Sequence, residues 1–307
     1  MIDVIVLLFV LTLLSWLVYC DAVLLRRRAQ ISYDAVMKFP PIVWGLGTPL
    51  LLAVALPFYL VLRQKWRKEA GSVLAFNPVS DALGVALQWF CGVLYFMIAL
   101  KGLAFLVPEL KQELMEMIIS IIFSSGWIIF LIYKTARHYP GFGFKEAIAW
   151  RKPKPSFLKA ALGAAALGVF FAVVSSYILV TRPESPSTPL SEALEANQSS
   201  LLMVIFLVLA VMVAPLVEEI IFRGYLFGVL DAARGRTTAI VVVALLFGLM
   251  HMDQYWGDWE AIALVTLLGL AMTIVRSLTG SVIASVITHY VYNGLVTVLP
   301  VVILGYR

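Results

Sequence analysis

The chain has 307 residues, of which 62% are hydrophobic and 13% charged, with a mean hydropathy of +0.96. Soluble domains carry roughly 25% charged residues, so this composition excludes a soluble globular protein and indicates an integral, multi-pass membrane protein. Lys and Arg exceed Asp and Glu by 23 to 18. Because much of this excess lies beside apolar runs, it indicates membrane topology and contact with lipid headgroups, not nucleic-acid binding.

Apolar runs of about 20 residues, the length that crosses a bilayer as a helix, follow one another along the chain. The fold class expected is therefore all-α, a polytopic transmembrane helix bundle of about 8 to 9 spans. We divide it into an N-terminal accessory transmembrane region, residues 1–155, and a C-terminal transmembrane domain, residues 156–307. The runs lie near 1–20, 41–62, 87–107, 115–134, 158–180, 201–230, 238–251, 260–275 and 280–303.

The distribution of Lys and Arg predicts which loops are cytoplasmic. The basic stretch 135–159 is assigned to the cytoplasmic side, and the acidic, Ser- and Pro-rich loop 182–200 to the opposite side. The rule fails near the N-terminus, where two basic groups, Arg26–Arg28 and Arg63–Lys68, flank one predicted span. The rule assigns both groups to the cytoplasmic side, but the two ends of a single span lie on opposite sides. The orientation of the N-terminal region is therefore left open.

Two features concern the shape of the helices. The run 201–230 is too long for one straight span, and Pro215 cannot donate to the carbonyl of Val211, so a kink is expected just before residue 218. In the preceding run, a stripe of small residues recurs at every fourth position and predicts close packing against another helix. The stripe consists of Ala164, Gly168 and Ala172.

Three ionisable residues lie inside the apolar run 201–230. A charged side chain there costs free energy, so its presence indicates a function. Glu219 and Arg223 are spaced i, i+4, so they are expected to form an ion pair on one helix face. Glu218 points away from that face and has no such partner. Desolvation should raise the pKa of Glu218 toward neutrality, where a carboxylate can take a proton from water.

Two of the three histidines also lie inside spans. His251 follows Phe247 at i, i+4, and His289 precedes Asn293 at the same spacing. His138 lies at a membrane edge, where a solvated role is expected. Ser281, Ser285 and Thr297 continue the stripe of His289 and Asn293, and we interpret them as packing residues.

Glu218, His251, His289 and Asn293 supply the groups needed to hydrolyse a peptide bond without a serine or cysteine nucleophile. The carboxylate would activate a water molecule, and neutral imidazoles would orient that water and donate to the developing oxyanion. A proton- or ion-coupled transporter also uses intramembrane Glu and His. Against a transporter, the sequence has no visible inverted repeat.

The ordered motifs Glu218-Glu219-x-x-x-Arg223, Phe247-x-x-x-His251 and His289-x-x-x-Asn293 resemble those of the CAAX protease and bacteriocin-processing (CPBP, or Abi) family of intramembrane proteases, which includes the type II CAAX prenyl endopeptidases. The resemblance covers about residues 156–303. It implies that Glu218 is the general base, that His251 and His289 hold the water, and that Asn293 stabilises the oxyanion. Glu219, Arg223 and Phe247 would support them.

The resemblance implies an intramembrane endopeptidase, multi-pass in the bacterial inner membrane, that cleaves a membrane-bound peptide or protein near the cytoplasmic face. No cofactor is expected, because Asn is a poor zinc ligand and no HExxH motif is present. A zinc-dependent version, with Glu218, His251 and His289 as ligands, remains open. A second alternative is a non-catalytic membrane scaffold or bacteriocin-immunity protein that uses the same polar cluster for structure.

Overall fold

The computed structural model describes residues 11–12, 14–23, 40–50, 52–69, 78–107, 113–137, 143–181 and 200–298. Regular structure in these ranges is helical throughout, without a strand. Five helices are long and apolar enough to cross a membrane, and four shorter apolar helices accompany them within the same ranges. The all-α, polytopic architecture predicted from the sequence is confirmed. His138 lies outside the described residues.

The chain forms two compact units. The first comprises residues 1–99 and 130–141, and the second residues 100–129 and 142–307. The boundary predicted at residues 155 and 156 stays a prediction, and residues 142–155, directly before it, belong to the second unit.

The first unit contains a helix at Leu14–Val23, α2 (Pro41–Leu50), α3 (Leu52–Glu69), the first part of α4 (Pro78–Leu106) and the end of α5 (Glu113–Ala136). The predicted single span 41–62 is wrong, because it is divided into α2 and α3. The ring of Trp44 in α2 lies 6.2 Å from that of Phe58 and 5.4 Å from that of Tyr59. In one straight helix, residues 14 apart would be separated by about 21 Å. The two helices therefore fold back on each other as a hairpin.

A buried ion pair fastens this hairpin to the helix at Leu14–Val23. Arg63 Nε lies 2.6 Å from Asp21 Oδ2, the hydroxyl of Tyr59 donates to the same oxygen at 2.7 Å, and Arg63 also donates to the Ser80 carbonyl. A Cβ at Gly84 would lie 2.5 Å from Arg63 Nη1, so the glycine leaves room for the guanidinium. Arg63 thus lies at the same end of this unit as Asp21, from which the chain continues to residues 26–28.

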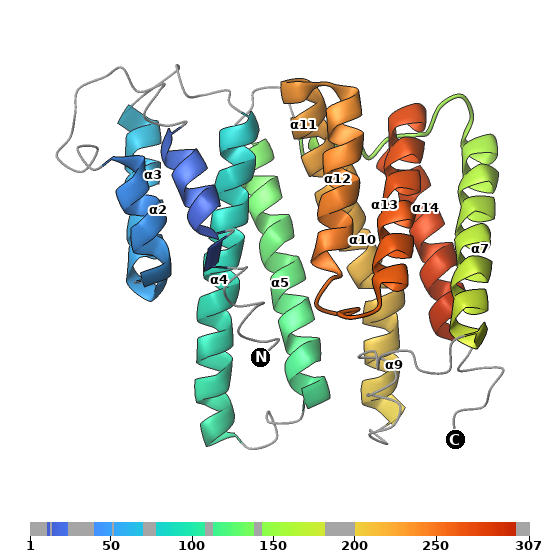
Figure 1. The fold of residues 1–307 in the computed structure, drawn as a ribbon, viewed down its shortest axis with the longest axis horizontal. Helices are drawn as coiled ribbons and strands as arrows, with labels where there is room; N and C mark the ends of the chain where they lie inside the picture. The colour runs from blue at the N-terminus through green and yellow to red at the C-terminus, as the bar shows by residue number, and fades with distance from the viewer. Residues whose placement is uncertain are drawn as a thin grey trace. The chain divides into compact units, whose positions relative to one another are not determined.

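The second unit contains the long helical stretch from residue 200 to 234, followed by three further helices. The stretch is built of α9 (Ser200–Val208), η3 (Leu209–Val213), α10 (Ala214–Glu219), η4 (Ile220–Leu226) and α11 (Phe227–Arg234). It is followed by α12 (Arg236–Met250), α13 (Trp259–Thr279), α14 (Val282–Asn293) and η5 (Gly294–Val298), and preceded by α6 (Phe144–Ala147) and α7 (Phe157–Thr181). α12 packs along α13, and α14 along α7 (Figure 1).

Just before Pro215, where a kink was expected, the helix contains a π-helical turn, η3, which ends two residues before the proline. A π-helical turn accommodates the proline ring and the unpaired carbonyl without ending the helix. A second π-helical turn, η4, begins directly after Glu219. The sequence analysis did not predict this second turn.

The small-residue stripe of α7 packs against α14, as predicted. Ala164 and Ala172 are buried, and a Cβ at Gly168 would lie 2.6 Å from the carbonyl oxygen of Thr288. The backbones of α7 and α14 therefore approach each other closely one residue before His289. Larger side chains at these positions would move α14 away.

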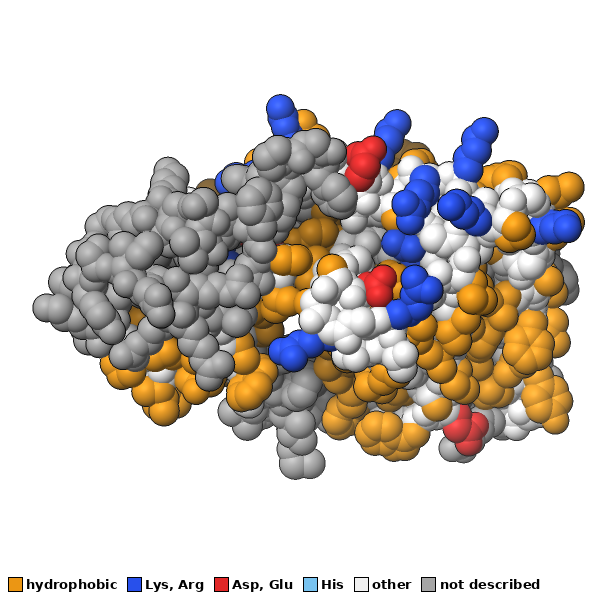
Figure 2. Space-filling model, turned by 90° about the horizontal axis from the view of Figure 1, so that it is seen from above, with side chains coloured by type: hydrophobic (Ala, Val, Ile, Leu, Met, Phe, Trp, Pro, Cys, Tyr) orange, Lys and Arg blue, Asp and Glu red, His pale blue; other side chains and the backbone are white. Residues whose placement is uncertain are grey.

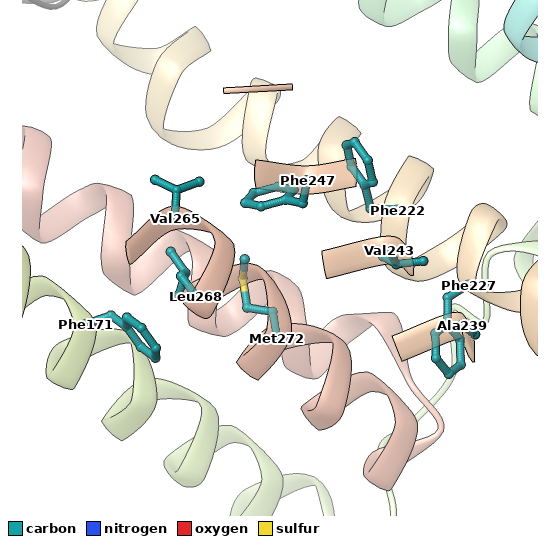
Figure 3. Close-up of a cluster of buried hydrophobic side chains, with 9 residues drawn as sticks. All are labelled: Phe171, Phe222, Phe227, Ala239, Val243, Phe247, Val265, Leu268 and Met272. Atoms are coloured by element: carbon teal, nitrogen blue, oxygen red, sulfur yellow. The ribbon is translucent and has the colours of Figure 1, made fainter. Parts of the chain in front are cut away.

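An apolar cluster packs residues of α7, α11, α12 and α13 around η4. The aromatic rings of Phe222 and Phe247 meet edge to face at 5.3 Å between centroids (Figure 3). α12 has 15 residues, about 22 Å of helix, which is shorter than the apolar layer of a bilayer. It is therefore too short to cross that layer by itself, and His251 follows its last residue. The cluster comprises Phe171, Phe222, Phe227, Ala239, Val243, Phe247, Val265, Leu268 and Met272.

The hairpin of α2 and α3 predicts that residues 26–28 and 63–68 lie on the same side of the membrane, which removes the conflict in the charge distribution. Single cysteines at Ala29 and Gln64, in a background with Cys20 and Cys91 replaced by Ser, should react with an impermeant thiol reagent from one side only, and from the same side. A cysteine at Gln112, beyond α4, should react from the other side. Reaction of Ala29→Cys and Gln64→Cys from opposite sides would mean that the run 41–62 crosses the membrane.

Candidate active site

A fully buried ion pair lies at the centre of the second unit. Arg223 Nη1 is 2.8 Å from Glu219 Oε1, and neither side chain is exposed. The guanidinium also donates to the Thr273 hydroxyl at 3.2 Å and to the Gly269 carbonyl at 2.8 Å, both on α13. A buried charge of this kind is tolerated only when it is paired and hydrogen-bonded, as it is here. The pair therefore joins η4 rigidly to α13.

His289, on α14, lies between the two glutamates. Its Nδ1 is 2.9 Å from Glu219 Oε1, and its Nε2 is 3.9 Å from Glu218 Oε2. Because the Glu219 carboxylate, paired with Arg223, can only accept, Nδ1 carries the proton. In the neutral ring, Nε2 then presents its lone pair toward Glu218. Glu219 thus orients the imidazole as well as neutralising Arg223, much as a buried carboxylate orients the histidine of a Ser-His-Asp triad.

Glu218 is the accessible member of the acidic pair. Its side chain is 31% exposed, whereas that of Glu219 is fully buried. The distance of 3.9 Å to His289 Nε2 is too long for a direct hydrogen bond and is of the size that a bridging water spans. Adjacent residues of one helix are therefore placed in two different environments, one structural and one open.

His251 follows the last residue of α12 and is half-buried. Its Nδ1 lies 2.8 Å from the carbonyl oxygen of Phe247. A carbonyl oxygen accepts and cannot donate, so Nδ1 carries the proton and Nε2 is again the lone-pair nitrogen. A neutral ring in this tautomer accepts a hydrogen bond from water at Nε2, but donates one there only after protonation. Donation from His251 or His289 to an oxyanion therefore requires the imidazolium form, which differs from the expectation of neutral donors.

The Phe247 ring contacts three other candidate site residues, His251, His289 and Arg223. Its centroid is 4.6 Å from the ring of His251, 5.9 Å from that of His289, and 4.1 Å from Arg223 Cζ. The last contact is a cation–π interaction with a fully buried guanidinium. A Cβ at Gly269 would lie 2.8 Å from this ring, so the glycine makes room for it. Phe247 thereby packs between the two imidazoles and the ion pair.

Asn293 lies one turn beyond His289 on α14. Its Nδ2 donates to the carbonyl of Ala210, in η3, at 3.2 Å. The observed partner of Asn293 is thus the neighbouring π-helical turn rather than another of the predicted site residues. The amide nitrogen has a second hydrogen, which this bond does not use.

The residues do not form a metal-binding group in the part of the chain that the structure describes. No three or more His, Cys, Asp or Glu side chains there are placed to hold a metal ion. The Nε2 lone pairs of His251 and His289 are of the type that binds zinc. The two histidines and Glu218, however, are not placed as three ligands around one metal position.

Sequence reasoning missed the residues of α13 that hold Arg223. Gly269 and Thr273 are spaced i, i+4 in an apolar helix, and this spacing was the available signal. Arg276 is 7% exposed and donates from Nε to the Arg223 carbonyl at 2.9 Å. Ser281 caps α14 by accepting from Ile283 N at 3.1 Å, in keeping with its interpretation as a structural residue.

Comparison with known protein families gives one match. Residues 200–295 match the family model of the type II CAAX prenyl endopeptidases, described as Rce1-like. No curated protein and no solved structure matches the chain. The matched residues include all the predicted site residues, from Glu218 on α10 to Asn293 at the end of α14. The predicted resemblance is confirmed for this part of the chain: residues 200–295 form an Rce1-like domain, consistent with the CPBP family of intramembrane proteases.

Proposed function

We propose that the protein is an intramembrane endopeptidase that hydrolyses a peptide bond of a membrane-associated protein or peptide with water activated by Glu218. The observation that carries this proposal is the position of His289, between a buried, charge-neutralised Glu219 and an accessible Glu218. A carboxylate facing a fixed imidazole lone pair across the span of one water is an arrangement suited to general-base catalysis.

In the proposed reaction, a water molecule lies between Glu218 and His289 Nε2 and donates one hydrogen bond to each, with His251 Nε2 as the alternative acceptor to His289. Glu218 accepts one proton as the water oxygen attacks the peptide carbonyl carbon. The same proton is then transferred to the amide nitrogen as the carbon–nitrogen bond breaks, which yields a carboxylic acid and an amine. The second N–H of Asn293 is the candidate donor to the oxyanion.

Each supporting residue has a role in this proposal that follows from its contacts. Glu219 fixes the tautomer and the orientation of His289. Arg223 keeps Glu219 ionised, and Phe247 sets the distance between the two imidazoles. We further propose that the protein resides in a bacterial inner membrane and requires no cofactor.

Replacement of Glu218 tests the general base directly. Glu218→Gln keeps the size of the side chain but cannot accept the proton, so cleavage should fall by about 10²–10⁴-fold with unchanged melting temperature. The measurement is cleavage of a membrane-peptide library by purified protein in lipid, followed by mass spectrometry. Glu260→Gln, the same change at an exposed position on α13, is the control. Full activity of Glu218→Gln would rule out the proposed base, and cleavage by neither wild type nor control would favour a scaffold or immunity protein.

A double substitution separates the orienting role of Glu219 from its role in stability. Glu219→Gln leaves Arg223 buried without a counter-charge, which should cost about 3–5 kcal/mol of stability and abolish cleavage. Adding Arg223→Met removes the unpaired charge, so stability should recover in part. Cleavage should stay absent, because His289 still lacks its carboxylate. If cleavage recovers along with the melting temperature, Glu219 has only a structural role.

Zinc removal distinguishes the metal-free mechanism from the zinc-dependent one. Wild-type cleavage should persist after incubation with a strong zinc chelator and dialysis, since the proposed chemistry needs only Glu218 and water. Loss of cleavage that is restored by added zinc would establish the metal-dependent alternative, with Glu218, His251 and His289 as ligands. The melting temperature, recorded in parallel, controls for chelator-induced unfolding.

A further inference from the structure

A short segment outside the proposed active site is bound to the turn between α13 and α14. This segment, residues 148–154, is called the strap below. Its backbone pairs twice with the turn, through Val282 N to Ala149 O at 3.1 Å and Lys154 N to Thr279 O at 3.0 Å. Arg151 Nε also donates to the Gly280 carbonyl at 2.7 Å. The strap is therefore a fixed part of this end of the second unit, although it lies outside the helices.

The strap and the turn between α11 and α12 together form a basic cluster. Its exposed members are Arg151, Lys152 and Lys154 from the strap, and Arg234 and Arg236 from the turn. Lys and Arg side chains gather on this face of the molecule (Figure 2). Arg276, buried beneath, interacts electrostatically with Arg151, Arg236 and Asp231, so residues from the strap, the turn and α13 lie close together.

The cluster has little neutralising charge of its own. Among the described residues, no ion pair joins any of the five exposed members to a carboxylate, and the acid that interacts with Arg276 is Asp231 alone. Like charges held together by backbone hydrogen bonds repel one another unless an anion binds between them. The cluster is thus arranged to accept an anion.

The position of the cluster in the membrane identifies the anion. α7 begins three residues after the strap, and its first residues Phe157 and Leu158 are 52% and 67% exposed. Trp150, in the strap itself, is 38% exposed. Tryptophan at the edge of an apolar belt marks the headgroup level of a bilayer. At that depth the abundant anion is the phosphate of an anionic phospholipid, which attracts each nearby Lys or Arg by about 1 kcal/mol.

We propose that the basic cluster is a binding site for an anionic phospholipid headgroup and that its occupancy supports the proposed active site. Two contacts connect the cluster to the helix of Glu218. A Cβ at Gly224 would lie 2.9 Å from the Cβ of Ile148, so the strap packs directly on η4. Arg276 donates to the Arg223 carbonyl in the same turn. A headgroup that neutralises the cluster therefore stabilises the turn that positions Glu219 and, through it, His289.

The binding part of this proposal does not depend on the protease activity, whereas its effect on cleavage rests on the proposed function. The test uses the full-length protein in nanodiscs of phosphatidylcholine, with or without one third phosphatidylglycerol. Phosphatidylglycerol should raise the melting temperature by roughly 4 °C or more, raise the cleavage rate severalfold, and remain bound to detergent-solubilised protein in native mass spectrometry.

Matched variants separate a defined site from general surface charge. Lys152→Gln with Lys154→Gln should remove the effect of phosphatidylglycerol on all three measurements. Lys145→Gln with Lys159→Gln removes the same charge from exposed positions next to the strap and should leave the effect in place. An equal loss in both variants would overturn the site in favour of diffuse charge attraction.

Two further results would also overturn the proposal. One is an equal response to both nanodisc compositions. The other is the same stabilisation by inorganic phosphate or by a soluble acidic peptide in phosphatidylcholine alone, which would identify a different anion. If the melting temperature and native mass spectrometry respond but no peptide is cleaved under any condition, the lipid site stands and the proposed function fails.

Discussion

The rest of the second unit depends on the buried ion pair of Glu219 and Arg223. Two opposite charges without solvent contact are stable only when they are paired and hydrogen-bonded. Arg223 donates hydrogen bonds to Thr273 and Gly269 on α13, and Glu219 accepts one from His289 on α14. The need to solvate one ion pair thus fixes three helices relative to one another, and the position of His289 relative to Glu218 follows from it.

The geometry of this network explains why two adjacent glutamates lie in different environments. One carboxylate is fully buried and permanently engaged, and the other is partly open to water. The π-helical turns on either side of α10 change the alignment of the surrounding residues, so that Arg223 and Phe222 are both buried although they follow one another. The proposed general-base role of Glu218 needs this separation, because pairing with an arginine makes a carboxylate a weaker base.

Sequence patterns predicted the elements that depend on local spacing. Run length identified most spans, small residues identified the contact of α7 with α14, and i, i+4 spacing identified the partner of Arg223. The hairpin of α2 and α3 was missed because hydropathy does not report reversal of direction; Gly45, Gly47 and Pro49, close to the break, were the local signals. The bridge from Glu219 to His289 joins residues 70 positions apart, and no local pattern specifies such a contact.

The same i, i+4 pair has a consequence for biosynthesis. The helix from residue 200 to 234 enters the bilayer before α13 and α14 are synthesised, so Arg223 then lacks Thr273, Gly269 and the other partners that later receive it. Because Glu219 lies one turn away on the same helix, the two charges cancel during insertion, and Glu218 and Asp231 are the remaining acids in that stretch. The motif therefore lets a strongly polar segment pass from the translocon into lipid first and acquire its completing contacts afterwards.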